Sequence, residues 1–226
     1  SSRRLMAHRY AIIVAGGRGL RMGADLPKQF LPLRGEPVLM HTLRQFAPEV
    51  DELILVLPAE QQDLWQELCA EHHFTLPHRI TTGGATRFDS VRSGLSELPA
   101  EGLVAVHDGV RPLVSHTLIR RTFEVAEETG AALPACPITD SLRFLGEDDT
   151  NEAVDRARYR AVQTPQTFDL ERLHRAYEQP FSPQFTDDAS VYEAAGLGAI
   201  TLVEGEETNI KLTTPRDLLL ADLLLD

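Results

Sequence analysis

Short apolar runs alternate along this chain with segments of helical periodicity. Residues 10–14 form such a run and lead into Gly16, residues 53–57 form a second that is stopped by Pro58, and residues 103–106 form a third. Apolar runs of this length, bounded by glycine or proline, are typical of buried strands. Because parallel neighbours need a crossover helix, the alternation predicts an α/β fold with a mostly parallel open sheet and helices on both faces.

The remaining elements extend this alternation, with one interruption. The pattern predicts further strands over 79–82, 131–136 and 200–203, and helices over 37–46, 61–72, 89–98, 115–129, 170–177, 188–195 and 215–225. Residues 137–159 contain no long helical pattern, carry the acidic residues Glu147, Asp148 and Asp149, and include a short β-like run at 141–145. We interpret 137–159 as a hairpin arm that projects from a single domain spanning 1–226.

Charge and composition exclude several classes of partner. The net charge is −12, so the overall field would repel nucleic acid and anionic membranes, and neither is an expected partner. No apolar run reaches the roughly 18 residues of a membrane helix, and residues 1–9 are not followed by the apolar stretch of a signal peptide. Cys69 and Cys136 are too few for a disulfide framework, which fits a reducing cytoplasm.

The loop after the first predicted strand is rich in glycine and in cations. In open α/β sheets, ligands bind beyond the carboxyl ends of the strands, so the loops after Val14, Thr82, Val106 and Val203 are the candidate site. Glycines let backbone N–H groups cradle phosphate oxygens, and cations beside them would neutralise a nucleoside triphosphate. The first loop supplies Gly16, Gly17 and Gly19 together with Arg18, Arg21 and Lys28.

Two familiar versions of such a loop do not match. A P-loop needs Gly-Lys followed by Ser or Thr, and the dinucleotide fingerprint needs a glycine where Met22 stands. The alternative is a flexible surface loop. Lys28 nevertheless stands out, because the chain has only two lysines, Lys28 and Lys211, and a compact ammonium differs chemically from the planar guanidinium used elsewhere.

Three other segments could join this site. Asp108, just past a predicted strand, is well placed to hold Mg²⁺ against phosphates, with Arg111 beside it; the alternative is a simple Asp-Gly turn. Gly84 and Ser90 could read the polar edge of a base, or could simply form a turn that begins a helix. Lys211 follows the last strand and could return to the site, or be one solvated lysine. The polar clusters 164–166 and 186–188 indicate no mechanism by themselves.

Taken together and in order, these segments resemble a known enzyme family. Residues 15–30, 106–112, 164–166, 186–190 and 209–211 resemble the 2-C-methyl-D-erythritol 4-phosphate cytidylyltransferases, and the match runs from about residue 10 to the end of the chain. The resemblance implies a Rossmann-like nucleotidyltransferase fold and a β-arm that interlocks two subunits of a homodimer. Segment 137–159 occupies the place of that arm.

The resemblance also implies a reaction. CTP and 2-C-methyl-D-erythritol 4-phosphate would give 4-diphosphocytidyl-2-C-methyl-D-erythritol and pyrophosphate, with Mg²⁺, in the non-mevalonate isoprenoid pathway. The attacking phosphate is already an anion and needs no general base, so catalysis would rest on alignment and on cations that oppose charge in the transition state.

The family's site residues carry over by position. The resemblance implies that Arg21, Lys28 and Lys211 stabilise the pentacoordinate phosphorus. It places CTP against Ala15, Gly16, Gly17, Gly19, Gly84, Ser90, Asp108 and Gly109, the metal at Asp108, and the sugar phosphate against Arg111, Arg156 and Thr186, with Arg156 donated by the partner subunit. Two departures affect contacts with the base: Gly16 replaces a frequent alanine, and Ala85 stands where related sequences can have an acid.

Other functions remain open at this point. Ribitol-5-phosphate cytidylyltransferase looks like an enzyme with the same scaffold and a similar first loop. The segments Val154-Asp155-Arg156 and 186–190 favour methylerythritol phosphate over ribitol phosphate as the substrate. A sugar-1-phosphate nucleotidyltransferase is a weaker alternative. A non-catalytic nucleotide-sensing module would not need lysines placed at the α-phosphate, so the cations argue against it.

Overall fold

The protein is built on one large sheet, which we describe from a computed structural model covering residues 6–16 and 26–225. The eight-stranded sheet has the order β10-β7-β11-β6-β1-β4-β5, with β12 also paired to β7. Its strands are β1 (Arg9–Val14), β4 (Glu52–Leu57), β5 (Arg79–Thr82), β6 (Leu103–Asp108), β7 (Ala131–Pro137), β10 (Arg160–Val162), β11 (Gln166–Asp169) and β12 (Thr201–Glu204). Most pairs are parallel, as predicted.

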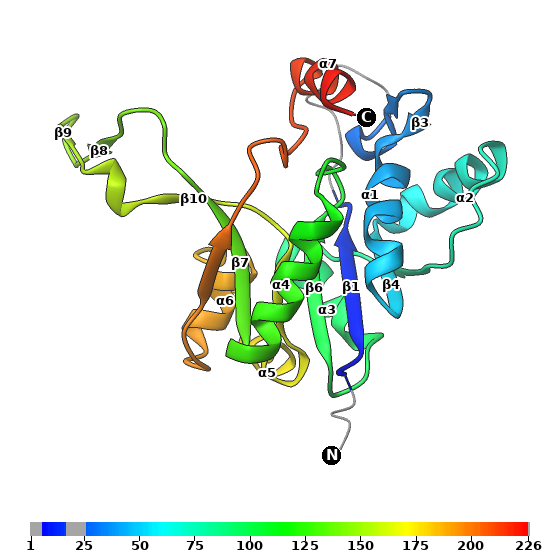
Figure 1. Ribbon diagram of the computed structural model, residues 1–226, viewed down its shortest axis with the longest axis horizontal. Coiled ribbons are helices and arrows are strands. Elements are labelled where there is room, and N and C mark those ends of the chain that lie inside the picture. The colour runs from blue at the N-terminus through cyan, green and yellow to red at the C-terminus, as the bar shows by residue number, and fades with distance from the viewer. Residues whose placement is uncertain (1–5, 17–25, 226) are drawn as a thin grey trace.

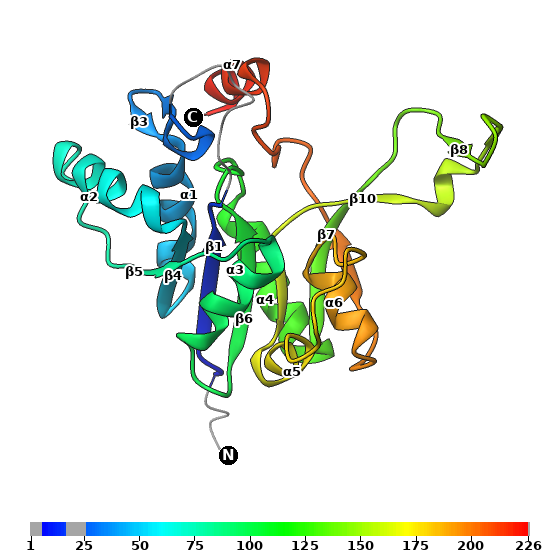
Figure 2. The same cartoon turned by 180° about the vertical axis from the view of Figure 1, so that it is seen from behind.

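Helices cover both faces of this sheet, and the two sides can be followed in Figures 1 and 2. They are α1 (Val38–Phe46), α2 (Gln62–Glu71), α3 (Arg87–Ser96), α4 (His116–Thr129), α5 (Leu170–Ala176), α6 (Asp188–Ala194) and α7 (Pro215–Leu224). The predicted helices are confirmed to within a few residues. The largest shift is at α3, which begins two residues earlier than predicted because Thr86 and Asp89 form a reciprocal capping box at its start.

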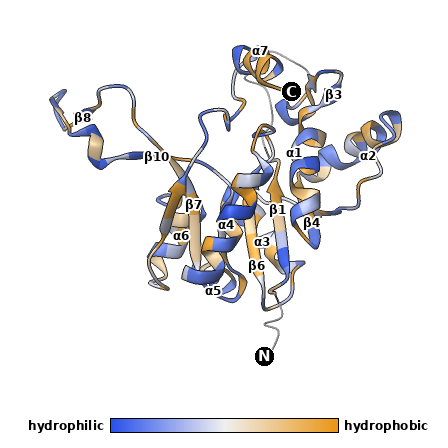
Figure 3. Cartoon of the chain, viewed as in Figure 1, coloured by the Kyte–Doolittle hydropathy of each residue, from blue (hydrophilic) through white to orange (hydrophobic). Residues whose placement is uncertain are grey.

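The period-two alternation of the strands creates two separate cores. In β1, Ala11 and Ile13 pack with α1, α2 and α4, whereas Tyr10 and Ile12 pack with α3, α5 and α6. Both sets of side chains are at most 7% exposed, which explains why the central strands are continuously apolar rather than alternating. Figure 3 shows the apolar colouring concentrated on these inner strands.

Register brings the ends of the central strands to one edge. Val14 of β1 lies beside Val56 of β4 and beside Asp108 of β6. All three strands run parallel, so the loops that follow them meet at the same end of the sheet, which is the edge where the sequence predicts the site. Strand β6 is longer than predicted and ends on Asp108 itself.

Two strands of the sheet, β10 and β11, were not predicted. β10 has only three residues and pairs antiparallel with β7. β11 runs antiparallel between β6 and β7, and its four residues, Gln-Thr-Phe-Asp, contain a single strongly apolar side chain. Thr167 is fully buried and donates a hydrogen bond to Thr122 at 2.9 Å. A strand whose buried polar side chains are satisfied by tertiary hydrogen bonds lacks the apolar pattern by which strands are predicted.

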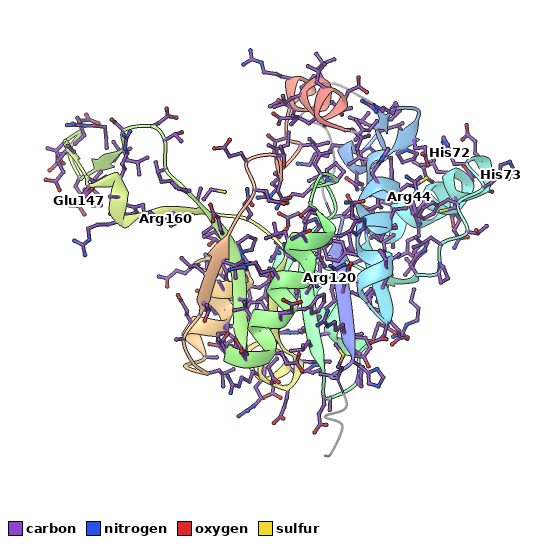
Figure 4. All side chains as sticks on the ribbon, in the orientation of Figure 1. Arg44, His72, His73, Arg120, Glu147 and Arg160 are labelled. Atoms are coloured by element: carbon purple, nitrogen blue, oxygen red, sulfur yellow. The ribbon has the colours of Figure 1, made fainter. Side chains whose placement is uncertain are left out.

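The predicted arm is present. After β7 the chain forms the two-stranded hairpin β8 (Arg143–Leu145) and β9 (Asn151–Ala153), passes through the 3-10 turn η5 (Arg156–Arg158) and returns as β10. The arm extends away from the sheet (Figures 1 and 2). In Figure 4, Glu147 on the arm lies on the opposite side of the molecule from His72 and His73, which follow α2.

Smaller elements complete the chain. Strands β2 (Pro32–Leu33) and β3 (Glu36–Pro37) form a short hairpin, and 3-10 turns lie at η2 (Lys28–Phe30), η3 (Ala47–Glu49) and η4 (Ala59–Gln61). Cys69 and Cys136 are partly buried free thiols at the margins of the core rather than inside it. Within the described ranges, no helix has both the length and the apolar character needed to cross a lipid bilayer.

Candidate active site

A cavity of about 250 Å³ lies at the carboxyl ends of β1, β5 and β6. Its walls come from five segments that are far apart in the sequence. The lining residues are Val14, Ala15, Gly16, Lys28, Gln29, Pro58, Gly83, Gly84, Ala85, Thr86, Arg87, Ser90, Asp108, Val110 and Lys211. The structure therefore brings Lys28, Lys211 and Asp108 together in the walls of one cavity.

Asp108 is the electrostatic centre of this cavity. Its Oδ1 lies 3.7 Å from Arg87 Nη2, and its Oδ2 lies 3.3 Å from Arg111 Nε and 3.9 Å from Lys211 Nζ. Burial by itself would raise the pKa of Asp108, but the positive charges of Arg87, Lys211 and Arg111 outweigh it, and the pKa is lowered. The carboxylate is ionised at neutral pH and oriented from both sides.

His107 holds the backbone of Asp108 in place. It is fully buried, and burial lowers its pKa to about 4, so the ring is neutral at physiological pH. Its Nε2 donates to the carbonyl of Arg111 at 3.0 Å, which leaves Nδ1 to accept from Thr164 Oγ1 at 2.8 Å. Thr164 Oγ1 in turn accepts from the Asp108 N–H at 3.1 Å.

His107 is thus a packed, hydrogen-bonded histidine. The same hydrogen bonds also give Thr164 a role that the sequence did not indicate. Both ring nitrogens are engaged within the protein, so the histidine is not available to abstract a proton from a ligand.

The two lysines reach the cavity from opposite ends of the chain. Lys28 lies in η2 and is partly buried, whereas Lys211 is exposed. The segment before Lys211 is anchored, because Asn209 donates from Nδ2 to the carbonyl of Thr164 at 2.9 Å and accepts at its own carbonyl from Arg111 Nη1 at 2.8 Å. Arg21, Gly17 and Gly19, which were predicted to join this cluster, lie outside the described residues.

The loop before α3 is packed tightly against the helix. The Gly84 N–H donates to Ser90 Oγ at 3.2 Å, and a Cβ at Gly84 would lie 2.4 Å from Asp89 Cβ. Only glycine therefore fits at this position. Gly16, on the other side of the cavity, faces open space: a Cβ there would meet no described atom within 4 Å, so nothing in this wall of the cavity explains why glycine replaces alanine.

Four predicted residues lie elsewhere. Gly109 packs behind the cavity wall, where a Cβ would meet Ala15 Cβ and Leu39 Cδ1 at 3.1 Å. Arg111 does not line the cavity, but its Nε lies 3.3 Å from Asp108 Oδ2. Thr186 is exposed in the loop before α6, and its N–H donates to Ser190 Oγ at 3.1 Å.

Arg156, the fourth of these residues, lies on the arm in the 3-10 turn η5. It is exposed, and its Nη1 donates to the carbonyl of Thr139 at 2.7 Å. Its own chain therefore does not bring it into the cavity, and a role at the site requires a second subunit.

The residues at the cavity fit Mg²⁺ only as an ion that is held jointly by the protein and a bound phosphate ligand. In the part of the chain that the structure describes, no group of three His, Cys, Asp or Glu side chains could hold a metal. Asp108 supplies one carboxylate at the rim of a cation-lined cavity. A single carboxylate completed by ligand phosphates and water is the usual way in which proteins hold Mg²⁺, so the residues present fit that ion.

Comparison with known proteins gives a consistent result. The family model for 2-C-methyl-D-erythritol 4-phosphate cytidylyltransferase (IspD) matches residues 10–226. The curated protein of that name from Porphyromonas gingivalis is 58% identical over 217 residues, which cover 96% of this chain and 97% of its own length. Its counterpart from Bacteroides thetaiotaomicron is 55% identical, with 95% and 98% covered.

Solved structures agree with the sequence relatives. The 4-diphosphocytidyl-2C-methyl-D-erythritol synthase from Anaerococcus prevotii superimposes with a TM-score of 0.82 at 30% identity, covering 97% of this chain and 98% of its own. The cytidylyltransferase from Thermus thermophilus gives a TM-score of 0.75 at 33% identity over 97% of this chain and 98% of its own.

Proposed function

The chain belongs to the 2-C-methyl-D-erythritol 4-phosphate cytidylyltransferase family, and from this premise we propose how its residues perform the family's reaction. The enzyme joins CTP and 2-C-methyl-D-erythritol 4-phosphate to give 4-diphosphocytidyl-2-C-methyl-D-erythritol and pyrophosphate, a step of the non-mevalonate isoprenoid pathway. The observation that carries the assignment of roles is the meeting of Lys28, Lys211 and Asp108 in one cavity at the carboxyl edge of the sheet.

The chemistry is a direct displacement at phosphorus. A phosphate oxygen of the sugar attacks the α-phosphorus of CTP, the bond from that phosphorus to the bridging oxygen breaks, and pyrophosphate leaves with the electron pair. We propose that Lys28 and Lys211, with Arg21, neutralise the charge that gathers on the α-phosphate oxygens. No proton has to be removed from the attacking group, which agrees with a site whose histidine is buried and fully hydrogen-bonded.

We propose that the nucleotide occupies the cavity between the first loop and α3. Ala15, Gly16, Gly84 and Ser90 offer backbone and hydroxyl groups to the cytidine, and Gly109 supports this wall from behind. Asp108 would hold Mg²⁺, which when bound neutralises the triphosphate charge. We propose Arg111 and Thr186, together with Arg156 of a partner subunit, as the groups that hold the sugar phosphate.

The acceptor can be tested by offering two sugar phosphates side by side. In a pyrophosphate-release assay with CTP, we expect rapid turnover with 2-C-methyl-D-erythritol 4-phosphate and little with ribitol 5-phosphate. The names of the relatives favour the first acceptor. Equal or faster turnover with ribitol phosphate would contradict the assignment, and release without any acceptor would indicate a hydrolase.

The Arg156→Ala substitution tests the site residue that lies on the arm. A charge-assisted contact to phosphate is worth roughly 1.5–3 kcal/mol, so we expect the KM for the sugar phosphate to rise about 10- to 100-fold with a smaller change in kcat. Arg158→Ala, in the same 3-10 turn, is the matched control and should behave like the wild type. An unchanged KM in Arg156→Ala would remove this residue from the site.

We propose that the single domain 1–226 forms a homodimer through the arm 137–159. Phe144 and Leu145 on the arm are 56% and 76% exposed, and an isolated two-stranded hairpin is only marginally stable in water. A second subunit would cover these side chains and receive Arg156. We also propose the cytoplasm as the site of action, because both cysteines are free thiols.

Light scattering measures the assembly directly. We expect a mass of twice 25.1 kDa for the wild type, and a monomer for the double variant Phe144→Glu/Leu145→Glu. The matched control is Leu223→Glu on α7, where the leucine is 82% exposed; it should remain a dimer. A wild-type monomer at assay concentration would contradict the dimer.

A further inference from the structure

A buried ion pair beside the cavity joins two helices that are distant in the sequence. Arg87, the first residue of α3, donates from Nη1 to Asp188 Oδ1 at 3.2 Å and from Nη2 to Asp188 Oδ2 at 2.9 Å. Asp188, the first residue of α6, is fully buried, and Tyr177 Oη also donates to its Oδ1 at 2.5 Å. The two-pronged contact fixes both distance and orientation, which a single hydrogen bond does not.

The α3 end of this pair belongs to the nucleotide side of the site. Arg87 directly follows the loop that carries Gly84, and Ser90 lies one turn further along the same helix. The guanidinium lines the cavity, and the Nη2 atom that binds Asp188 also lies 3.7 Å from Asp108 Oδ1. Burial would lower the pKa of Arg87, but Asp188 and Asp108 raise it, so the group stays charged.

The α6 end belongs to the proposed sugar-phosphate side. Thr186 precedes Asp188 by two residues, and its N–H donates to Ser190 Oγ in the first turn of α6 at 3.1 Å. Gln166 accepts at Oε1 from the Ala189 N–H at 2.9 Å and donates from Nε2 to Asp187 at 3.0 Å. The position of Thr186 is thus tied to the first turn of a seven-residue helix, and that turn is tied to α3 by Asp188.

We propose that Arg87 and Asp188 are positioning residues that clamp the sugar-phosphate side of the active site to its nucleotide side. The proposal rests on the proposed function, since it assumes that the loop at Thr186 receives the sugar phosphate. Neither residue needs to touch that substrate. Their pairing sets the position of Thr186 relative to Asp108 and to the cavity. Asp188 also balances the charge of Arg87, which leaves the carboxylate of Asp108 available to other groups.

Other contacts already hold α3 to the segment that follows α5. Arg92, further along α3, donates from Nε to the carbonyl of Tyr177 at 3.1 Å and from Nη2 to that of Gln179 at 2.9 Å. The rings of Phe88 and Tyr177 stack with their centroids 4.8 Å apart. The fold therefore does not depend on the Arg87–Asp188 pair alone, and Arg92 offers a matched control that joins α3 to the segment just before α6, away from the cavity.

The test compares steady-state kinetics, CTP binding by calorimetry and thermal unfolding in a set of full-length variants. Asp188→Asn keeps the shape and removes the charge, Arg87→Lys keeps the charge and removes the fork, and Arg92→Lys is the control. For the first two we expect the KM for methylerythritol phosphate to rise at least about tenfold and kcat/KM for it to fall about a hundredfold, as for an active-site displacement on the order of 1 Å. In Asp188→Asn the Kd for CTP should change far less than the KM for methylerythritol phosphate, because Asp188 does not line the cavity and the loops around Gly16 and Gly84 are unchanged.

Each outcome decides the matter. If Asp188→Asn does not fold, Arg87→Lys carries the same test, because it leaves a cation beside Asp188. A lower unfolding temperature with unchanged kinetic constants would make the pair merely structural and overturn the proposal. An equal rise in KM in Arg92→Lys, or a loss of CTP affinity as large as the loss of turnover, would also overturn it. No turnover by the wild type would contradict the proposed function, and the clamp with it; normal wild-type turnover with normal variants would overturn the clamp alone.

Discussion

Replacing Lys28 with alanine is expected to lower kcat by a factor of about 10² to 10³, the usual cost of removing one group that stabilises transition-state charge. Lys28 lines the cavity with Lys211 and Asp108, and its compact ammonium is proposed to face the α-phosphate oxygens, where charge grows as the new bond forms. Because CTP is proposed also to contact backbone groups of several loops, its Kd should change far less than kcat. Rapid-quench measurement of CTP consumption at saturating substrates would give this ratio.

Two further variants sharpen the test at Lys28. Lys28→Arg keeps the positive charge but presents a planar fork, and we expect it to recover only part of the lost rate. Arg34→Ala removes an exposed cation from the neighbouring hairpin, where it donates to the carbonyl of Asp222 at 2.8 Å, and turnover should be unaffected. Near-normal kcat in Lys28→Ala would exclude the lysine from the chemical step.

Asp108→Asn is expected to have the second large effect, on both activity and stability. The substitution keeps the size of the side chain but removes the negative charge that lies within 3.9 Å of Arg87, Arg111 and Lys211. Removing one partner from a buried charge cluster costs on the order of 3 kcal/mol. We also expect kcat/KM to fall at least about a hundredfold, because the proposed metal ligand is lost and Lys211 is no longer held at its place.

The control for Asp108→Asn is a carboxylate that is paired away from the cavity. Glu49 accepts from Arg120 at 2.7 and 3.2 Å, and Arg120 lies on α4 (Figure 4). Glu49→Gln should lower the unfolding temperature slightly and leave turnover intact. Denaturant titration and pyrophosphate release on both variants separate the two effects. Wild-type turnover in Asp108→Asn would contradict its assignment as the centre of the site.

The sequence predicts much of this fold because its central strands and helices carry strong local signals. The run 53–57 is apolar throughout because both faces of β4 are buried. Ser115 caps α4, which begins one residue after the start of the helix predicted over 115–129. Parallel strands put their carboxyl ends together, which is why the sequence predicts Lys28, Ser90 and Asp108 at one edge of the sheet. The ordered motifs then named the family.

Other features depend on tertiary partners that leave no local pattern. β11 is a strand because it fits between β6 and β7, not because its four residues favour one. Thr164 matters through its contact with His107, and Arg87 through an aspartate 101 positions away. A pairing over that distance cannot be inferred from one sequence. The only local signal is that Arg87 stands between Gly84 and the predicted helix over 89–98.

The most direct test of the account is a crystal structure of the full chain with CTP and Mg²⁺. The account predicts that the Nζ atoms of Lys28 and Lys211 both approach oxygens of the α-phosphate at about 2.7–2.9 Å, with the cytidine against Gly84 and Ser90. A triphosphate bound away from both ammonium groups, or one that meets them only at the γ-phosphate, would contradict the claim that these lysines act on the reacting phosphorus.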